Sequence, residues 1–161
     1  MRATLGTEAE QRPGVVRALE LLLADEFVLY TKTRNYHWNV VGPGFSELHK
    51  FLDDQYNALN GTVDEVAERI RALGGWAIGT LGEFGEKTRL KESPGQFPGA
   101  RTMLENLLRD HETVIRELRD LTEQCAQQYH DGATEGFLTE LTVRHEKMAW
   151  MLRSLVAPTV P

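Results

Sequence analysis

The chain has 161 residues and a mass of 18.2 kDa, a size typical of one domain with a substantial hydrophobic core. Its hydrophobic fraction of 41% excludes a disordered chain, and its net charge of −6 argues against a protein whose main role is to neutralise nucleic-acid phosphates. The single cysteine, Cys125, excludes an internal disulfide framework and favours a reducing compartment. No apolar run approaches the roughly 20 residues that span a bilayer, and no secretory signal pattern opens the sequence, so we expect a cytoplasmic protein without membrane association.

Glycine and proline cluster at a few points and divide the chain into four long segments, in which apolar residues recur at helical spacing. We expect helices over about residues 13–40, 45–73, 99–127 and 133–156, after a flexible N-terminal tail over about residues 1–12, all in one domain spanning 1–161. The link between the second and third helices is long, and residues 80–88 within it are compatible with a short extra helix. The expected fold is an all-α four-helix bundle with a long crossover, the topology of ferritin-like bundles.

Five residues form a candidate set of metal ligands: His37, His49, Asp53, Asp64 and Glu68. The last four are two pairs with four-residue spacing in the second expected helix, so the side chains of each pair project from one side. Imidazole and carboxylate together suit iron, manganese or zinc. A solvated helix face is the alternative interpretation. The two pairs occupy a helix face that is separate from the apolar stripe. This face is poor in long charged side chains, which favours the metal site over a solvated face.

Distance restricts how these pairs can act together. His49 and Asp64 are about 22 Å apart along a helix that rises 1.5 Å per residue, so the two pairs cannot bind one metal ion within a single chain. They can share one if the second helix packs antiparallel against its copy, across a two-fold axis near residues 58–59. No histidine in the sequence has a glutamate three residues before it, so the Glu-x-x-His ligands of ordinary di-iron bundles are absent.

One continuous block of the sequence contains Tyr36-His37-Trp38-Asn39-Val40, Gly42, Phe45, Leu48-His49, Leu52-Asp53, Asp64-Glu65-Val66-Ala67-Glu68-Arg69 and Leu73-Gly74-Gly75. This block resembles the Dps family of mini-ferritins, and the five candidate ligands match the family's inter-subunit ferroxidase centre position by position. The resemblance implies a hollow homo-dodecamer of four-helix subunits that binds iron as Fe(II) at dimer interfaces. It also implies oxidation of that iron by hydrogen peroxide or oxygen, and storage as a ferric mineral. Trp38 matches a family aromatic residue near the centre and would be an electron donor or radical sink, with packing against the interface as the alternative.

The sequence departs from this family in its charged termini. Several family members hold DNA with a tail rich in lysine and arginine, but residues 1–14 contain only Arg2 and Arg12, against Glu8 and Glu10. The last five residues carry no charged side chain. We therefore expect DNA binding to be weak or absent. Asp131 and Glu135 are plausible counterparts of the acidic residues that line the family's three-fold pore.

Other polar residues have a structural interpretation beside a functional one. His111 and His145 lie on apolar stripes and are predicted to be hydrogen-bonded core histidines rather than ligands. His130 is interpreted as a loop residue, with surface iron binding as the alternative. Cys125 is predicted to be a small buried hydrophobe, and Asp54 a solvated charge, with mineral nucleation as the alternative. Two rival functions stay open at this point: a nucleoid-binding structural protein and a metal-free helical adaptor.

Overall fold

The computed structural model describes residues 11–157, and within that range it contains five α-helices and no strand. The helices are α1 (Arg12–Asn39), α2 (Phe45–Ala72), α3 (Leu81–Lys87), α4 (Ala100–Gln127) and α5 (Gly132–Val156). No helix among these residues is long and apolar enough to cross a membrane. The four-helix bundle, its long crossover and the short helix in the link are all as predicted, with helix ends within one or two residues of expectation. Most of the predicted N-terminal tail, residues 1–10, lies outside the described residues.

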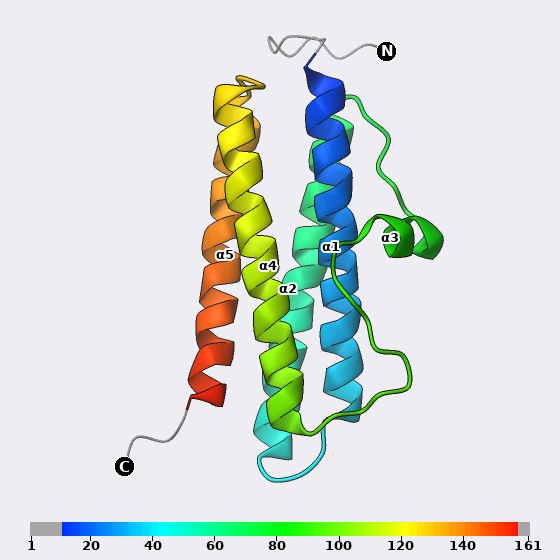
Figure 1. Ribbon diagram of the computed structural model, residues 1–161, viewed down its shortest axis with the longest axis vertical. Coiled ribbons are helices and arrows are strands. Elements are labelled where there is room, and N and C mark those ends of the chain that lie inside the picture. Colours follow the sequence, from blue (N-terminus) through cyan, green and yellow to red (C-terminus); the bar gives the residue numbers. More distant parts are fainter. Residues whose placement is uncertain (1–10, 158–161) are drawn as a thin grey trace.

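The four long helices form two antiparallel hairpins, α1 with α2 and α4 with α5, which pack side by side (Figure 1). The chain runs down α1, up α2, up α4 and down α5, because the link between α2 and α4 carries it back to the end of the bundle where α2 begins. Contacts within each hairpin far exceed those between the hairpins. The bundle therefore has a seam between its two halves.

The ends of α2 follow from its flanking glycines. Gly44 precedes the helix with φ 74°, and Gly74 follows it with φ 87°, a left-handed conformation that glycine adopts without steric cost. Beyond the last turn, the Gly74 N–H bonds the carbonyl of Arg71, and the Gly75 N–H bonds that of Ile70. This Schellman arrangement satisfies two carbonyls that the helix leaves free. It ends α2, which is one uninterrupted helix of 28 residues.

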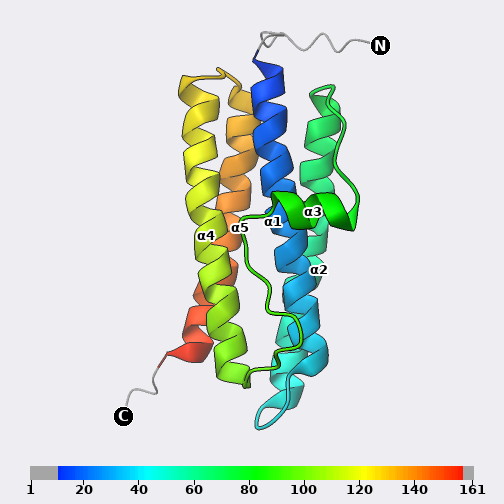
Figure 2. The same cartoon turned by 45° about the vertical axis from the view of Figure 1, so that its right-hand side comes forward.

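A continuous core of mainly leucine side chains fills the bundle; its largest fully buried members include Leu19, Leu22, Leu29, Leu52, Leu59, Leu107, Leu118, Leu138 and Leu141. Helix α3 lies outside the four-helix bundle and crosses α1 (Figure 2). Phe84 attaches α3 to the bundle, since its ring stacks on that of Phe27 with centroids 4.2 Å apart.

The crossover is fastened along α1 by polar contacts. Asp25 of α1 is fully buried, and its carboxylate accepts hydrogen bonds from the Thr88 hydroxyl at 2.9 Å and from the Arg89 N–H and Nε at 2.7 Å. Further along, Lys32 donates to the carbonyl of Lys91 at 2.9 Å. A charged group without exposure to water needs such partners. These contacts hold the descending link against α1 (Figure 2).

Candidate metal centre

Two histidines face each other across the loop that joins α1 to α2. His37 lies in the last turn of α1 and His49 in the second turn of α2; their rings stack with centroids 3.8 Å apart. His37 Nδ1 lies 2.8 Å from the carbonyl oxygen of His49, and His49 Nδ1 lies 2.9 Å from that of His37. The His37 carbonyl is available because it is among the last four of α1, which have no partner within the helix. A short loop thus aligns both rings.

This reciprocal bonding determines the tautomer of both histidines. A carbonyl oxygen only accepts hydrogen bonds, so each Nδ1 must carry a proton and donate it. In the neutral ring, Nε2 then keeps its lone pair, and a backbone carbonyl that orients the ring in this way is a common outer partner of a metal-binding histidine. Within the described chain, no hydrogen bond occupies the Nε2 atom of either ring. Both rings are therefore prepared to bind a metal ion.

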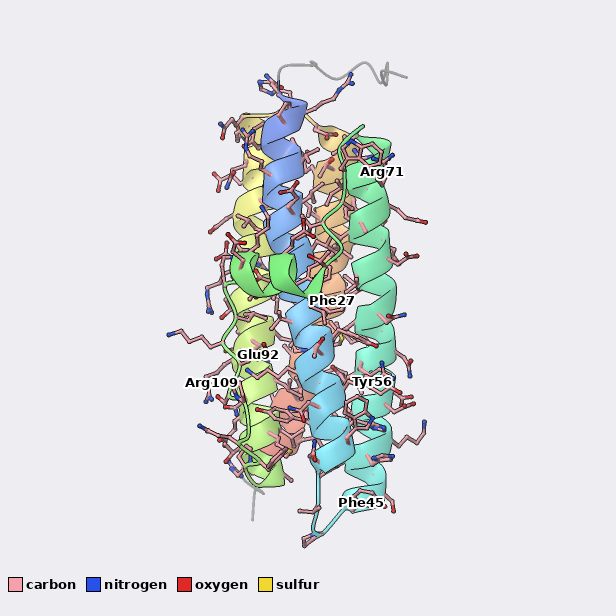
Figure 3. The ribbon with its side chains drawn as sticks, turned by 90° about the vertical axis from the view of Figure 1, so that its right-hand side faces the viewer. Phe27, Phe45, Tyr56, Arg71, Glu92 and Arg109 are labelled. Atoms are coloured by element: carbon pink, nitrogen blue, oxygen red, sulfur yellow. The ribbon has the colours of Figure 1, made fainter. Side chains whose placement is uncertain are left out.

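Asp53 follows His49 by one turn of α2, and two neighbours on the same helix orient its carboxylate. Tyr56 donates its hydroxyl hydrogen to Oδ1 at 2.6 Å, and the Asn57 amide lies 3.3 Å from Oδ2. The ring of Tyr56 meets that of His37 edge-on, with centroids 5.2 Å apart, and Figure 3 shows Tyr56 on the half of α2 nearer its start. The bond to Asp53 raises the pKa of Tyr56 above its usual value, so the hydroxyl keeps its proton.

The sequence interpretation missed both of these orienting residues. Tyr56 falls within the apolar spacing of residues 45–73, yet its hydroxyl reaches the candidate ligand Asp53. The signal that could have found them is their spacing of three and four residues after Asp53, which places polar groups on the same side of a helix.

Trp38 lies beside His37 in sequence but points to the surface, where 64% of it is exposed. Its ring contacts the guanidinium of Arg34, which lies 5.1 Å from the ring centroid. Arg34 also lies over the ring of Tyr56 at 5.6 Å and donates to the Tyr30 hydroxyl at 2.6 Å. The arginine therefore connects Trp38 to the aromatic residues around the histidines through cation–π contacts.

Asp64 and Glu68 lie further along α2, and the structure does not bring them to the other three candidates. Both side chains are exposed, and neither has a hydrogen bond or ion pair within residues 11–157. The described part of one chain contains no group of three or more His, Cys, Asp or Glu side chains placed to bind a metal ion. The two carboxylates are thus available to a ligand or partner outside the chain.

Exposed apolar side chains surround the histidine end of α2. Val41 is 75% exposed and Phe45 45% exposed, and the ring of Phe45 stacks on His49 with centroids 5.1 Å apart. Figure 3 shows Phe45 at the tip of the hairpin. Together with Trp38, these residues form an apolar rim beside the candidate ligands. Clustered exposed apolar residues are typical of an interaction surface.

Asp131, a candidate pore residue, is buried and fully engaged at the start of α5. Its carboxylate accepts from the Thr134 N–H at 3.1 Å and the Thr134 hydroxyl at 2.5 Å, and it pairs with Arg69 at 3.3 Å. These contacts make Asp131 the N-terminal cap of α5, which does not favour a role in a pore. Glu135, one turn later, is half-buried beside a groove between α4 and α5.

The prediction that His111 and His145 are hydrogen-bonded core histidines is confirmed. Both are at most 1% exposed, and their Nδ1 atoms lie 3.0 Å apart. Their acidic partner, Glu26, was not identified from the sequence, although a pair of acids inside the apolar run of α1 was a signal for buried charge.

The remaining candidates have the surroundings that the structural interpretations predicted. His130 is exposed in the loop before α5, with φ 49°. Cys125 is buried, and burial raises the pKa of its thiol to about 11, so the reactive thiolate is disfavoured at neutral pH. Asp54 is exposed, and its carboxylate lies 3.3 Å from Nζ of Lys50 on the preceding turn of α2.

Comparisons with known proteins extend over almost the whole chain. Residues 16–159 match the ferritin-like domain family. The chain is 44% identical over 155 residues to an uncharacterized low temperature-induced protein of Nostoc sp., which covers 96% of this chain and 87% of that protein. It is 36% identical over 142 residues to DNA protection during starvation protein 2 of Bacillus anthracis, covering 88% of this chain and 96% of that one.

Solved structures agree with the sequence comparison. DpsC from Streptomyces coelicolor matches 100% of this chain and 94% of its own with a TM-score of 0.94 at 28% identity. The Dps protein from Vibrio cholerae O1, described as a member of a broad superfamily of ferritin-like diiron-carboxylate proteins, matches 98% of both chains with a TM-score of 0.90 at 28% identity. The bundle described above therefore has the ferritin-like fold.

Proposed function

Because this chain belongs to the Dps family of ferritin-like proteins, we propose that it oxidises Fe(II) at sites shared between two subunits and stores the product as a ferric mineral in a hollow dodecamer. The observation that carries the proposal is the division of the ligands along α2. His37 of α1 and the α2 residues His49 and Asp53 are aligned at one end. About 22 Å further along α2 lie two exposed carboxylates that have no partner within residues 11–157. Neither half is a complete site.

An antiparallel pairing of two α2 helices completes both halves at once. His37, His49 and Asp53 of one subunit then face Asp64 and Glu68 of the partner subunit, and the two-fold axis repeats the arrangement. The surface of α2 near the proposed axis is exposed and carries small side chains; its residues are Asn57, Ala58, Asn60 and Gly61. Small side chains allow two helices to approach closely, and the apolar rim at Phe45 would be covered in such a dimer.

Iron is the substrate of the proposed reaction. Two Fe(II) ions each give one electron to hydrogen peroxide, whose O–O bond breaks, and with two protons the products are two Fe(III) ions and two water molecules. Using both electrons together avoids release of hydroxyl radical. The three carboxylates favour Fe(III) over Fe(II) because hard oxygen donors stabilise the higher charge, and oxygen is the alternative oxidant. Trp38, linked to the site through Arg34, is proposed as an electron donor that consumes stray oxidising equivalents.

The decisive experiment mixes two inactive variants. His49→Ala and Glu68→Ala damage opposite halves of each shared site, so each homogeneous variant should lose most of its rapid Fe(II) oxidation. In a mixed dimer, one site lacks both residues while the other regains the complete set. Co-refolded variants should therefore recover activity, approaching half of the wild-type rate per dimer when every dimer is mixed.

The assay is the initial rate of Fe(II) oxidation after anaerobic loading and addition of peroxide, with oligomer size checked by light scattering. Co-refolding of His49→Ala with Asp53→Ala is the matched control, because both changes damage the same half and mixing should restore nothing. No gain in the first mixture, despite confirmed mixed dimers, would refute the shared site. A protein that scatters light as a monomer at micromolar concentration would refute the dodecamer as well.

A further inference from the structure

A second set of titratable side chains lies inside the bundle, away from the candidate metal centre. Glu26 of α1, His111 of α4 and His145 of α5 are each at most 1% exposed. His145 Nε2 lies 2.8 Å from Glu26 Oε1, and its Nδ1 lies 3.0 Å from His111 Nδ1. Glu26 belongs to the first hairpin and both histidines to the second. The three residues, here called the Glu26–His145–His111 chain, therefore cross the seam of the bundle.

The two distances fix the protons that lie within the contacts of these three residues. Each of the two short contacts accommodates one proton between two heavy atoms. A third proton belongs on His111 Nε2, which is itself buried without a hydrogen-bond partner among the described residues. The three side chains together are then neutral, because one imidazolium balances the Glu26 carboxylate. A buried site favours this arrangement, since an uncompensated charge in a low-dielectric interior is costly.

A fourth proton has no suitable position. Glu26 Oε2 is also buried without a hydrogen-bond partner among the described residues, so a proton there would have no acceptor and would leave one imidazolium unbalanced. A second proton between the two Nδ1 atoms would set two N–H groups against each other at 3.0 Å and break the contact. Burial and the neighbouring His145 accordingly hold the pKa of His111 well below its usual value.

Among the described residues, no nearby group offsets an added positive charge. Asp25, adjacent to Glu26, already binds Arg89, and Asp110, adjacent to His111, pairs with Lys32 at 2.6 Å. The buried side chains of α2 and α3 include no titratable group, and those of α5 include only His145. On α4 the other buried titratable residue is Cys125, which is neutral in acid. The more distant buried groups of α1, Tyr36 and His37, belong to its far end.

We propose that the Glu26–His145–His111 chain is an acid-sensitive contact between the two hairpins. It joins them at neutral pH and weakens their packing at the seam when it is forced to take up a further proton. Once the seam opens, His111 gains the ordinary histidine affinity for protons, with a midpoint near pH 6.5. Below that pH the opened or unfolded protein binds more protons than the folded protein. Stability is therefore lost as pH falls from about 6.5, with the unfolding constant rising up to tenfold per pH unit from this one group. This proposal is independent of the iron chemistry.

The test compares His111→Asn with the wild type by equilibrium unfolding in urea at pH 7 and pH 5, at one protein concentration. The asparagine oxygen can accept from His145 in place of Nδ1 but does not titrate. The unfolding constant of the wild type relative to the variant should rise about 20-fold between these two pH values. His130→Asn, at an exposed loop position, is the matched control and should leave the wild-type pH dependence unchanged. Neither substitution changes His37 or His49, so any contribution from these two residues is common to all three proteins.

A measurement on the wild type avoids dependence on the folding of the variant. In histidine labelled with carbon-13, the ring signal of His111 should keep its neutral position down to the pH at which the bundle opens. A ratio of unfolding constants that is the same at pH 7 and pH 5 would overturn the proposal. Reversible protonation of His111 between pH 7 and 5.5, with the bundle still closed, would overturn it equally.

Discussion

At the residue scale, the orientation of Asp53 depends on two side chains that are not themselves candidate ligands. The Tyr56 hydroxyl and the Asn57 amide each occupy one carboxylate oxygen. Such outer contacts limit the rotation of a ligand and thus reduce the entropy that metal binding must overcome. The reciprocal bonds between His37 and His49 have the same effect on the two rings. In the proposed site, three ligands from one chain are thus held by contacts within that chain.

Removal of the Tyr56 hydroxyl should therefore weaken iron chemistry without damage to the fold. Tyr56→Phe keeps the ring against His37 but frees Oδ1 of Asp53. We expect the initial rate of Fe(II) oxidation at low iron to fall by about tenfold or more, in line with other losses of outer-shell contacts. Tyr129→Phe, far from the site on the loop after α4, should leave the rate unchanged. An unaltered rate in Tyr56→Phe would show that this hydroxyl has no role in positioning the ligand.

At the scale of the elements, the crossover is the part of the fold whose position is least determined by apolar packing. It contributes few large buried side chains, of which Phe84 and Leu90 are the main examples. Its course along α1 depends instead on Asp25, whose buried carboxylate binds Thr88 and Arg89. Arg89 also pairs with Glu117 of α4. Arg89 thus connects the link to both hairpins, through Asp25 of α1 and Glu117 of α4.

Asp25→Asn should loosen this link. The substitution removes the buried negative charge and places an amide against the Arg89 guanidinium, so we expect a loss of about 3 kcal/mol of stability in urea unfolding. Trypsin should also cleave faster at Lys87, Arg89 and Lys91. The control is Asp54→Asn, which removes an exposed carboxylate paired with Lys50 and should change stability by less than about 0.5 kcal/mol. Equal trypsin sensitivity of Asp25→Asn and the wild type would contradict the assigned role.

At the scale of the whole molecule, the net charge of −6 per chain opposes attraction to DNA, and the proposed assembly into a shell would multiply that charge. We therefore predict little DNA retention in a gel-shift assay at about 150 mM salt. The relatives named for DNA protection make the measurement important, because protection by iron removal and protection by DNA binding are separable activities. Tight retention that resists added salt would favour the nucleoid-binding alternative and reveal a cationic surface that net charge conceals.

The sequence by itself determined the elements and their boundaries. Periodicity over 28 residues and the Gly74-Gly75 stop specify α2 locally, because helix formation depends on neighbours three and four residues apart. The same regularity fixed the separation of His49 from Asp64, and hence predicted that no single chain gathers all five candidate ligands. The core histidines could also be predicted, since their positions on apolar stripes are a property of the pattern.

Only the tertiary structure decided which polar groups meet across elements. Glu26 and His145 lie 119 residues apart in sequence and 2.8 Å apart in space, and no local pattern encodes that pairing. The same holds for Asp25 with Arg89, for Asp131 with Arg69, and for the two Nδ1 bonds that select the tautomers of His37 and His49. Local spacing reports on one helix at a time, whereas hydrogen bonds between helices depend on the rotation and offset that core packing imposes on each.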